Sequence, residues 1–208
     1  MSYRLLAPFY ALCERLIFGS ILQRARLALT REFPEQIVIF GEGDGRFSAA
    51  LPSHLHWIAI EEDPFMKRQI LRRSPHAKIY PSWSSLPYSE RVKAEALVCP
   101  FSLDCLTPAE LSTLLQQLTV PSLFLTDFFP EEVSPKVLRP PARLLVNAMY
   151  RFFHILTALP AHQLPPIRDM LENSAWILTT ERTFCFGFIR SQQWQKRGSR
   201  QGTEKDLC

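Results

Sequence analysis

The ten residues 37–46, IVIFGEGDGR, constrain the fold of this 208-residue chain more than any other stretch. The continuous apolar run at its start predicts a strand that is buried on both faces. Glycines at alternate positions, Gly41, Gly43 and Gly45, then predict a turn with positive φ angles, in which bare backbone N–H groups approach a ligand. The chain becomes helix-like at Phe47, so the stretch predicts a strand, a glycine turn and a helix whose positive end faces a polar ligand.

A second predicted strand, residues 56–60, lies about 20 residues further on and ends at two acids, Glu61 and Glu62. An acidic side chain in this place accepts hydrogen bonds from a ribose diol, so we expect a nucleoside across the tips of two adjacent parallel strands. The dinucleotide fingerprint requires its third glycine one position later than here, where this chain has Arg46. The glycine pattern therefore favours a nucleoside other than NAD.

Residues 37–46 and 58–67 (IAIEEDPFMK) resemble the first two motifs of the class I S-adenosylmethionine-dependent methyltransferases. The resemblance continues through residues 3–19, 97–106 and 123–129, and in order and spacing it covers roughly residues 3–194. It implies an α/β, Rossmann-like fold with a doubly wound, mostly parallel seven-stranded sheet. It also implies an antiparallel edge hairpin, which we place at residues 176–180 and 182–189, and a helical N-terminal cap.

The resemblance also implies a site for S-adenosylmethionine. In this family the glycine turn receives the methionine and ribose part of the cofactor, and the acid that ends the second strand binds the ribose hydroxyls. The candidate cofactor-binding residues in these places are Gly41, Glu42, Gly43, Gly45, Glu61 and Glu62.

Three further cofactor contacts are expected from the same resemblance. A tyrosine of the cap, Tyr10, would close over the carboxylate end of the cofactor; the alternative is that it simply packs. The family's usual adenine-binding aspartate is replaced by Ser82 and Trp83, which would bind adenine by a hydroxyl hydrogen bond and by stacking. The alternative is that Trp83 is ordinary core and that the backbone alone binds adenine. Pro100 would end the fourth strand beside the cofactor.

The sequence offers no evident general base at the tip of that fourth strand, which we expect at residues 94–99. Asp104 lies close by, and we assign it a structural hydrogen bond to the turn. Asp127 follows the predicted fifth strand, residues 122–126, and a carboxylate there faces the ligand crevice, so it is a candidate catalytic acid or the cap of the next segment. His154 is a second catalytic candidate, with a surface or core role as the alternative.

We predict one domain over residues 1–194, with residues 1–34 as the helical cap. Residues 130–160, a proline-rich loop and a helix, form an insertion over the acceptor side in the resembled fold. The aromatic and methionine side chains of this insertion favour an aromatic or lipophilic acceptor. Residues 195–208 lack hydrophobic periodicity, and we expect a disordered basic tail.

Composition excludes several other classes of protein. The net charge of +4 forces no basic face, so we expect no nucleic-acid partner. Five cysteines without C-x-x-C spacing favour neither a disulfide framework nor a metal site. The sequence contains no secretory signal and no uninterrupted apolar run of about 18 residues, so we expect a cytoplasmic protein without a transmembrane segment.

The sequence therefore predicts an S-adenosylmethionine-dependent methyltransferase, monomeric or homodimeric, that acts on a small aromatic or lipophilic acceptor. Two alternatives stay open. One is a catalytically inactive methyltransferase-like binding or scaffold protein, which the missing adenine aspartate favours. The other is an NAD-linked oxidoreductase, which Arg46 disfavours.

Overall fold

The computed structural model describes residue 14, residues 18–157, residue 161 and residues 163–198. The strands are β1 (Gln36–Phe40), β2 (His56–Ile60), β3 (Ile79–Tyr80), β4 (Ala96–Pro100), β5 (Ser122–Phe128), β6 (Trp176–Phe184) and β7 (Ile189–Lys196). The helices are α2 (Ile21–Arg26), α3 (Pro64–Arg73), α4 (Tyr88–Lys93), α5 (Pro108–Gln117), α6 (Arg139–Thr157) and α7 (Ile167–Asn173).

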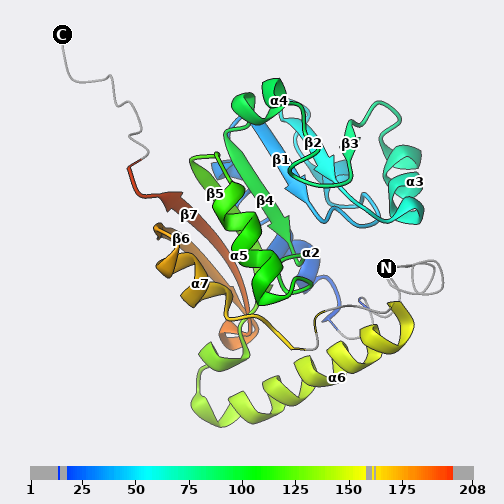
Figure 1. Ribbon diagram of the computed structural model, residues 1–208. Helices are drawn as coiled ribbons and strands as arrows, with labels where there is room; N and C mark the ends of the chain where they lie inside the picture. The colour runs from blue at the N-terminus through cyan, green and yellow to red at the C-terminus, as the bar shows by residue number, and fades with distance from the viewer. Residues whose placement is uncertain (1–13, 15–17, 158–160, 162, 199–208) are drawn as a thin grey trace.

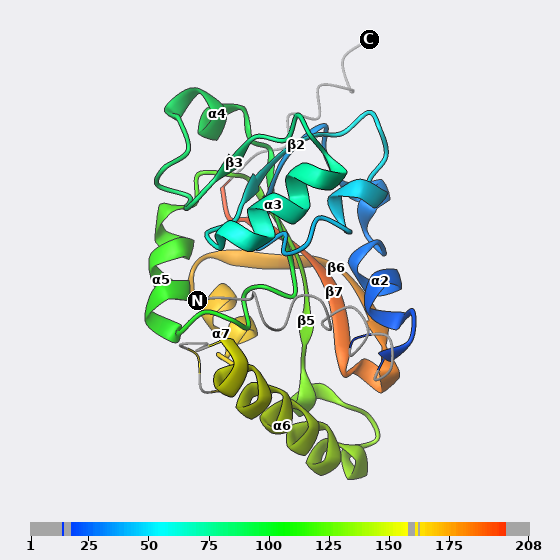
Figure 2. The same cartoon turned by 90° about the vertical axis from the view of Figure 1, so that its right-hand side faces the viewer.

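The strands form one seven-stranded sheet in the order β3-β2-β1-β4-β5-β7-β6 (Figure 1). The pairs from β3 to β5 are parallel, whereas β7 is antiparallel to both of its neighbours. Helices α4, α5 and α7 lie on one side of the sheet and α2 lies on the other (Figure 2). The predicted doubly wound, mostly parallel sheet with an antiparallel edge hairpin is therefore confirmed.

Alternate side chains of the central strands enter two different cores. Val38 of β1 packs in a cluster that also contains side chains of α5, α7, β6 and β7. Its neighbours Ile37 and Ile39 pack in the opposite cluster, with Phe33 and Phe124, whose ring centroids are 4.8 Å apart. Burial on both faces explains why the strand reads as a continuous apolar run and not as an alternating one.

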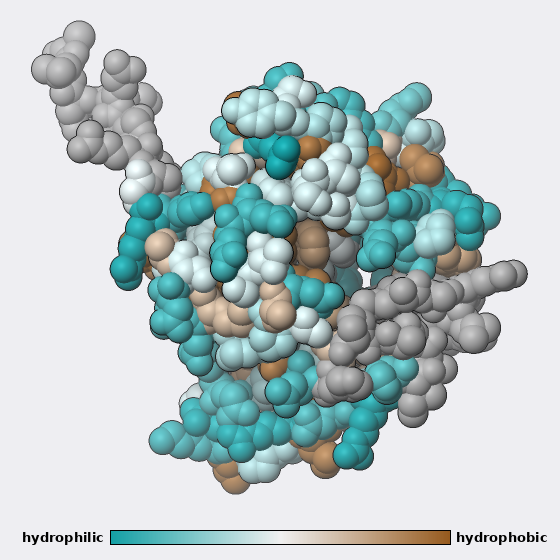
Figure 3. Space-filling model, in the orientation of Figure 1, coloured by the Kyte–Doolittle hydropathy of each residue, from teal (hydrophilic) through white to brown (hydrophobic). Residues whose placement is uncertain are grey.

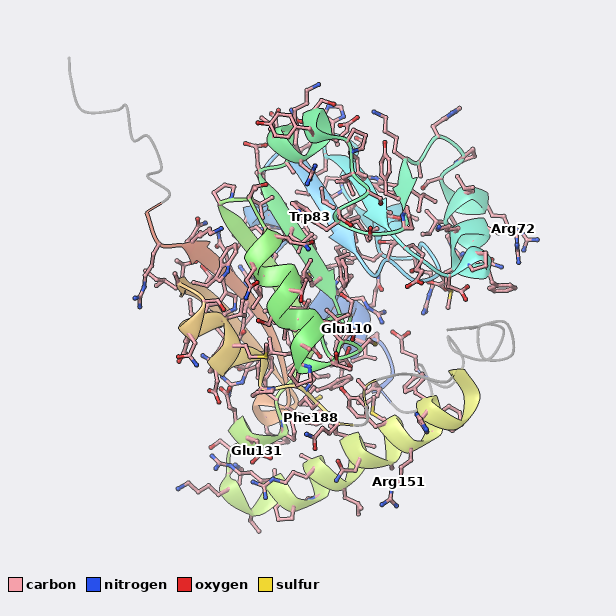
Figure 4. All side chains as sticks on the ribbon, viewed as in Figure 1. Arg72, Trp83, Glu110, Glu131, Arg151 and Phe188 are labelled. Carbon is pink, nitrogen blue, oxygen red and sulfur yellow. The ribbon has the colours of Figure 1, made fainter. Side chains whose placement is uncertain are left out.

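Two helices begin at the predicted residues because the capping signals are local. The Asp63 carboxylate accepts hydrogen bonds from the backbone N–H groups of Phe65 and Met66, at 2.8 and 2.9 Å, and Pro64 opens α3. Thr107 and Glu110 form the expected capping box at the start of α5 (Figure 4).

The predicted hairpin strands were placed wrongly. β6 extends to Phe184, and the chain reverses in the 3₁₀ turn Cys185–Gly187, not near residue 181. Positive φ angles at Cys185 and Phe186 make this turn, although neither residue type signals it. β7 carries buried polar residues, which hide its alternation, and it ends at Lys196, two residues beyond the predicted domain end.

Within the predicted 130–160 insertion, the long helix α6 lies below the ends of the strands (Figure 1). α6 begins at Arg139, three residues before the expected start, because two prolines fit a first turn whose N–H groups need no partner. Val146 and Tyr150 pack against Phe128 at the end of β5. Most of the predicted cap, residues 1–13 and 15–17, and the tail beyond residue 198 lie outside the described residues.

Candidate functional site

The register of the sheet brings the two sequence motifs together. Phe40 pairs with Ile60 across β1 and β2, so Gly41 and Glu61 leave the sheet side by side. On the other flank, β4 pairs in parallel with β1 and ends at Pro100. The crevice therefore opens at the carboxyl ends of β1, β2 and β4, as predicted.

A pocket of about 760 Å³ occupies this edge of the sheet. Residues after β1, β2 and β4 line one part of it, and α2, α6 and Glu14 line the rest. Figure 3 shows the surface hollowed at this edge, with hydrophobic side chains inside the hollow. The size and the mostly apolar lining are typical of a small-molecule site.

The three glycines of the turn all have positive φ angles but serve different purposes. A Cβ at Gly41 would lie 2.4 Å from the Cβ of Ser102, whose hydroxyl donates a 2.8 Å hydrogen bond to the carbonyl of Phe40. A Cβ at Gly43 would meet nothing within 4 Å, so the backbone there is open to a ligand. Gly45 packs against the backbone of Ile70 in α3 and does not line the pocket.

Glu61 is held against the glycine turn. Its carboxylate accepts hydrogen bonds from the N–H of Gly43, at 3.1 Å, and from the N–H of Asp63, at 2.9 Å. Burial raises the pKa of Glu61 above its ordinary value. The side chain therefore stands where the sequence places the ribose acceptor, and the exposed Glu62 also lines the pocket.

Glu42 is a buried acid in the pocket wall. Its Oε1 accepts a 2.9 Å hydrogen bond from the N–H of Ser48, and its Oε2 has no hydrogen-bond partner among the described residues. Burial raises the pKa of Glu42 from 4.5 to about 7. A carboxyl oxygen without a partner in such a place is open to a donor group of a ligand.

We expect Glu42→Gln to stabilise the protein above neutral pH. Because burial raises the pKa of Glu42 in the folded state, its favourable contribution is complete below about pH 4.5 and is lost as the pH rises through about 7. The glutamine does not titrate. Its advantage in unfolding free energy over the wild type should grow by about 1–3 kcal/mol between these limits. Urea unfolding of both proteins across this pH range measures the difference in unfolding free energy. A difference that does not change with pH would show that the pKa of Glu42 is not raised.

A network of ion pairs, which sequence analysis missed, borders the pocket. Glu14 pairs with Arg26 of α2 at 2.5 Å and with Arg46 of the glycine turn at 2.8 Å. Arg46 also pairs with Asp44 at 2.7 Å, and Arg73 of α3 reaches the same carboxylate at 3.7 Å. The residue that breaks the dinucleotide fingerprint is thus the centre of this network.

The part of the pocket that faces α6 is apolar. Phe101 and Phe128 lie with ring centroids 5.0 Å apart, and the guanidinium of Arg26 lies 5.1 Å from the Phe101 ring. From α6, the side chains of Leu145, Met149 and others contribute to the same lining. This wall suits a hydrophobic ligand surface.

The adenine-binding predictions for Trp83 and Ser82 are not supported. Trp83 is buried in the core, where its indole N–H donates to the carbonyl of Gln117 at the end of α5 (Figure 4), so a stacking role is wrong. Ser82 is half-buried and forms hydrogen bonds within its own loop, to Ser84 and Ser85. The neighbouring Pro81, and not these two residues, lines the pocket.

The two predicted catalytic residues do not reach the pocket. Asp127 is completely buried. Its carboxyl group accepts hydrogen bonds from the N–H groups of Phe128, at 2.9 Å, and Asp104, at 3.2 Å. His154 is exposed on α6 and does not line the pocket. Of the remaining predicted contacts, Pro100 lines the pocket and Tyr10 lies outside the described residues.

The described part of the chain contains neither a metal-binding cluster nor a helix that could span a membrane. No group of three or more histidine, cysteine, aspartate or glutamate side chains there is arranged to hold a metal ion. None of the helices described combines the length and the apolar character needed to cross a membrane.

No protein-family model matches the chain, and no curated protein matches it either. Solved structures do. Mitomycin 7-O-methyltransferase MmcR is 16% identical with a TM-score of 0.61, over 94% of this chain and 61% of that one. An O-methyltransferase family protein from Burkholderia thailandensis is 10% identical with a TM-score of 0.63, over 93% and 60%. The methyltransferase domain of bacterial CtHen1-C is 8% identical with a TM-score of 0.57, over 85% and 96%.

These similarities define the fold class. The chain has the Rossmann-like fold of the class I S-adenosylmethionine-dependent methyltransferases, as the sequence motifs predict. It spans about three fifths of the length of MmcR and of the Burkholderia protein. At these identities the likeness shows the fold alone.

Proposed function

We propose that this protein is an S-adenosylmethionine-dependent methyltransferase that acts on a small aromatic or lipophilic acceptor. The observation that carries the proposal is the position of Glu61, held beside the N–H of Gly43 at the edge of an apolar pocket. Glu61 would accept hydrogen bonds from the ribose hydroxyls of the cofactor, and the open backbone at Gly43 would admit its close approach.

The charge of the pocket fits this cofactor. Carboxylates outnumber cationic side chains in its lining; Glu42 is buried and Glu61 is half-buried. The unpartnered Oε2 of Glu42 is suited to accept a hydrogen bond from an ammonium group. An acidic wall favours a ligand that carries both a sulfonium and an ammonium charge.

When bound, the cofactor supplies an activated methyl group for an in-line displacement. The residues of this chain contribute alignment and exclusion of water. Phe101, Phe128 and Met149 provide an apolar wall on the acceptor side, against which a flat or greasy acceptor packs. Alignment in a water-poor pocket supplies a large part of the rate of such reactions.

Two observations support the proposed class of acceptor. MmcR is a mitomycin 7-O-methyltransferase, and the Burkholderia protein is of an O-methyltransferase family. Their likeness to this chain supports a hydroxyl acceptor, and the apolar side chains of α6 support an acceptor with a hydrophobic body.

Binding of S-adenosylhomocysteine, the demethylated product form of the cofactor, tests the proposal. At a ligand concentration about 100 times its Kd, the unfolding free energy should rise by about 2.7 kcal/mol, which raises the Tm by roughly 5–10 °C. NAD at the same concentration should produce a smaller shift. No shift with either compound would favour the scaffold alternative, and a larger shift with NAD would favour an oxidoreductase.

A further inference from the structure

Asp104 lies in the loop between β4 and α5 and lines the acceptor side of the pocket. Its backbone is fixed from two directions. The N–H of Asp104 donates to Oδ2 of Asp127 at 3.2 Å, and its carbonyl accepts a 2.6 Å hydrogen bond from the hydroxyl of Tyr150 on α6. The carboxyl group of Asp104 itself interacts with the thiol and the backbone of the adjacent Cys105.

One oxygen of that carboxyl is left without a partner. Oδ1 of Asp104 is buried and accepts no hydrogen bond from any described residue. A buried polar atom without a partner lowers stability unless a ligand satisfies it. Since Asp104 lines the pocket, a ligand that carries a hydrogen-bond donor is suited to satisfy this oxygen.

The surroundings prepare Asp104 to take up a proton near neutral pH. Burial raises the pKa of Asp104 to about 6. Burial and the neighbouring charge of Asp104 raise the pKa of Asp127 well above its ordinary value. The other titratable neighbours, Cys105 in the same loop and Tyr150 on α6, have pKa values that burial raises, and both stay neutral.

We propose, on the basis of the proposed methyl transfer, that Asp104 receives the hydrogen of the acceptor's hydroxyl group, and that the acceptor is a phenol or an enol. The apolar wall of Phe101, Phe128 and Met149 holds the body of the acceptor, and the carboxylate of Asp104 fixes its hydroxyl. This assignment supplies the base that the strand tip at Pro100 lacks.

The step is balanced within the site. The O–H bond of the acceptor breaks as its hydrogen passes to the Asp104 carboxylate, and the acceptor oxygen forms a bond to the methyl carbon. The electron pair of the broken carbon–sulfur bond stays on the sulfur. The products are a methyl ether, a neutral thioether and a protonated Asp104, so no further reactant is needed.

The test uses 4-nitrophenol, whose neutral and ionised forms absorb at different wavelengths, with the full chain saturated with S-adenosylhomocysteine. An ionised carboxylate accepts a hydrogen bond from the neutral phenol and repels the phenolate, whereas an amide donates to the phenolate. We therefore expect Asp104→Asn to weaken binding of the neutral form about tenfold or more. It should also lower the pKa of bound 4-nitrophenol by about one unit or more.

Controls separate this inference from the proposed function. Asp169→Asn, an exposed change of the same kind on α7, should behave as the wild type. If the wild type binds S-adenosylhomocysteine but does not bind 4-nitrophenol, or if Asp104→Asn leaves the bound pKa unchanged, the Asp104 inference is overturned and the proposed function stands. If the wild type does not bind S-adenosylhomocysteine, both are overturned.

Discussion

Replacing Gly41 with alanine is expected to lower the free energy of unfolding by about 2–5 kcal/mol. The φ angle of +67° at this position disfavours any residue with a Cβ, by about 1–2 kcal/mol. In addition, the new Cβ would lie 2.4 Å from the Cβ of Ser102, and relief of that overlap costs about 1–3 kcal/mol. Urea unfolding followed by circular dichroism measures the change, with an unaltered slope indicating that only stability has changed.

Gly43→Ala is the matched control for this change. Gly43 has the same φ of +67°, but a Cβ there would meet no atom within 4 Å. Its cost should therefore be limited to the backbone contribution of about 1–2 kcal/mol. Equal losses for the two variants would show that Ser102 does not pack against the turn as described.

Replacing Glu61 with glutamine is expected to weaken binding of S-adenosylhomocysteine by about 10–150-fold, a loss of about 1.5–3 kcal/mol. The glutamine keeps the size of the side chain and one acceptor oxygen, so the contact to the N–H of Gly43 has a replacement. It loses the charge and the second acceptor oxygen, which a ribose diol would share with the N–H of Asp63. Isothermal titration calorimetry of both proteins gives the ratio of the two Kd values.

Glu62→Gln provides the comparison, because it makes the same chemical change one residue further on. Glu62 is exposed at the edge of the same pocket, where water competes for its hydrogen bonds. Its replacement should change the Kd by less than about threefold. If Glu62→Gln raised the Kd more than Glu61→Gln does, Glu62 and not Glu61 would be the residue that binds the ribose.

The central part of the fold could be predicted because its signals are local. The apolar run before Gly41, the capping aspartate before Pro64 and the capping box at Thr107 each specify an element within a few residues. The contact between Glu61 and the glycine turn followed from those elements, since adjacent parallel strands deliver their carboxyl ends to one edge.

The wrong predictions concern residues whose surroundings come from distant segments. Trp83 is in the core because α5 offers a carbonyl for its indole N–H. Asp127 lies within β5, one residue before its end, and the loop at Asp104 covers it. The hairpin was misplaced because the reversal at Cys185 uses positive φ angles on residues that rarely adopt them.

The ion pairs around Arg46 are contacts that the sequence did not predict, again because the partners come from distant segments. Glu14 and Arg46 are 32 positions apart, and neither residue belongs to a motif that indicates the other. Only the fold brings their charges to 2.8 Å from each other, at the border of the pocket. Likewise Asp104, which the sequence assigns to a turn, is held at the pocket by Asp127 and Tyr150.

A crystal structure of the protein with S-adenosylhomocysteine tests the central claim most directly. The account predicts the ribose hydroxyls within hydrogen-bond distance of the Glu61 carboxylate, with the amino-acid end of the ligand beside Gly43 and Glu42. It also predicts space next to the sulfur, between Phe101 and α6. A ligand bound elsewhere, or a ribose that leaves Glu61 bonded only to the backbone N–H groups of Gly43 and Asp63, would contradict it.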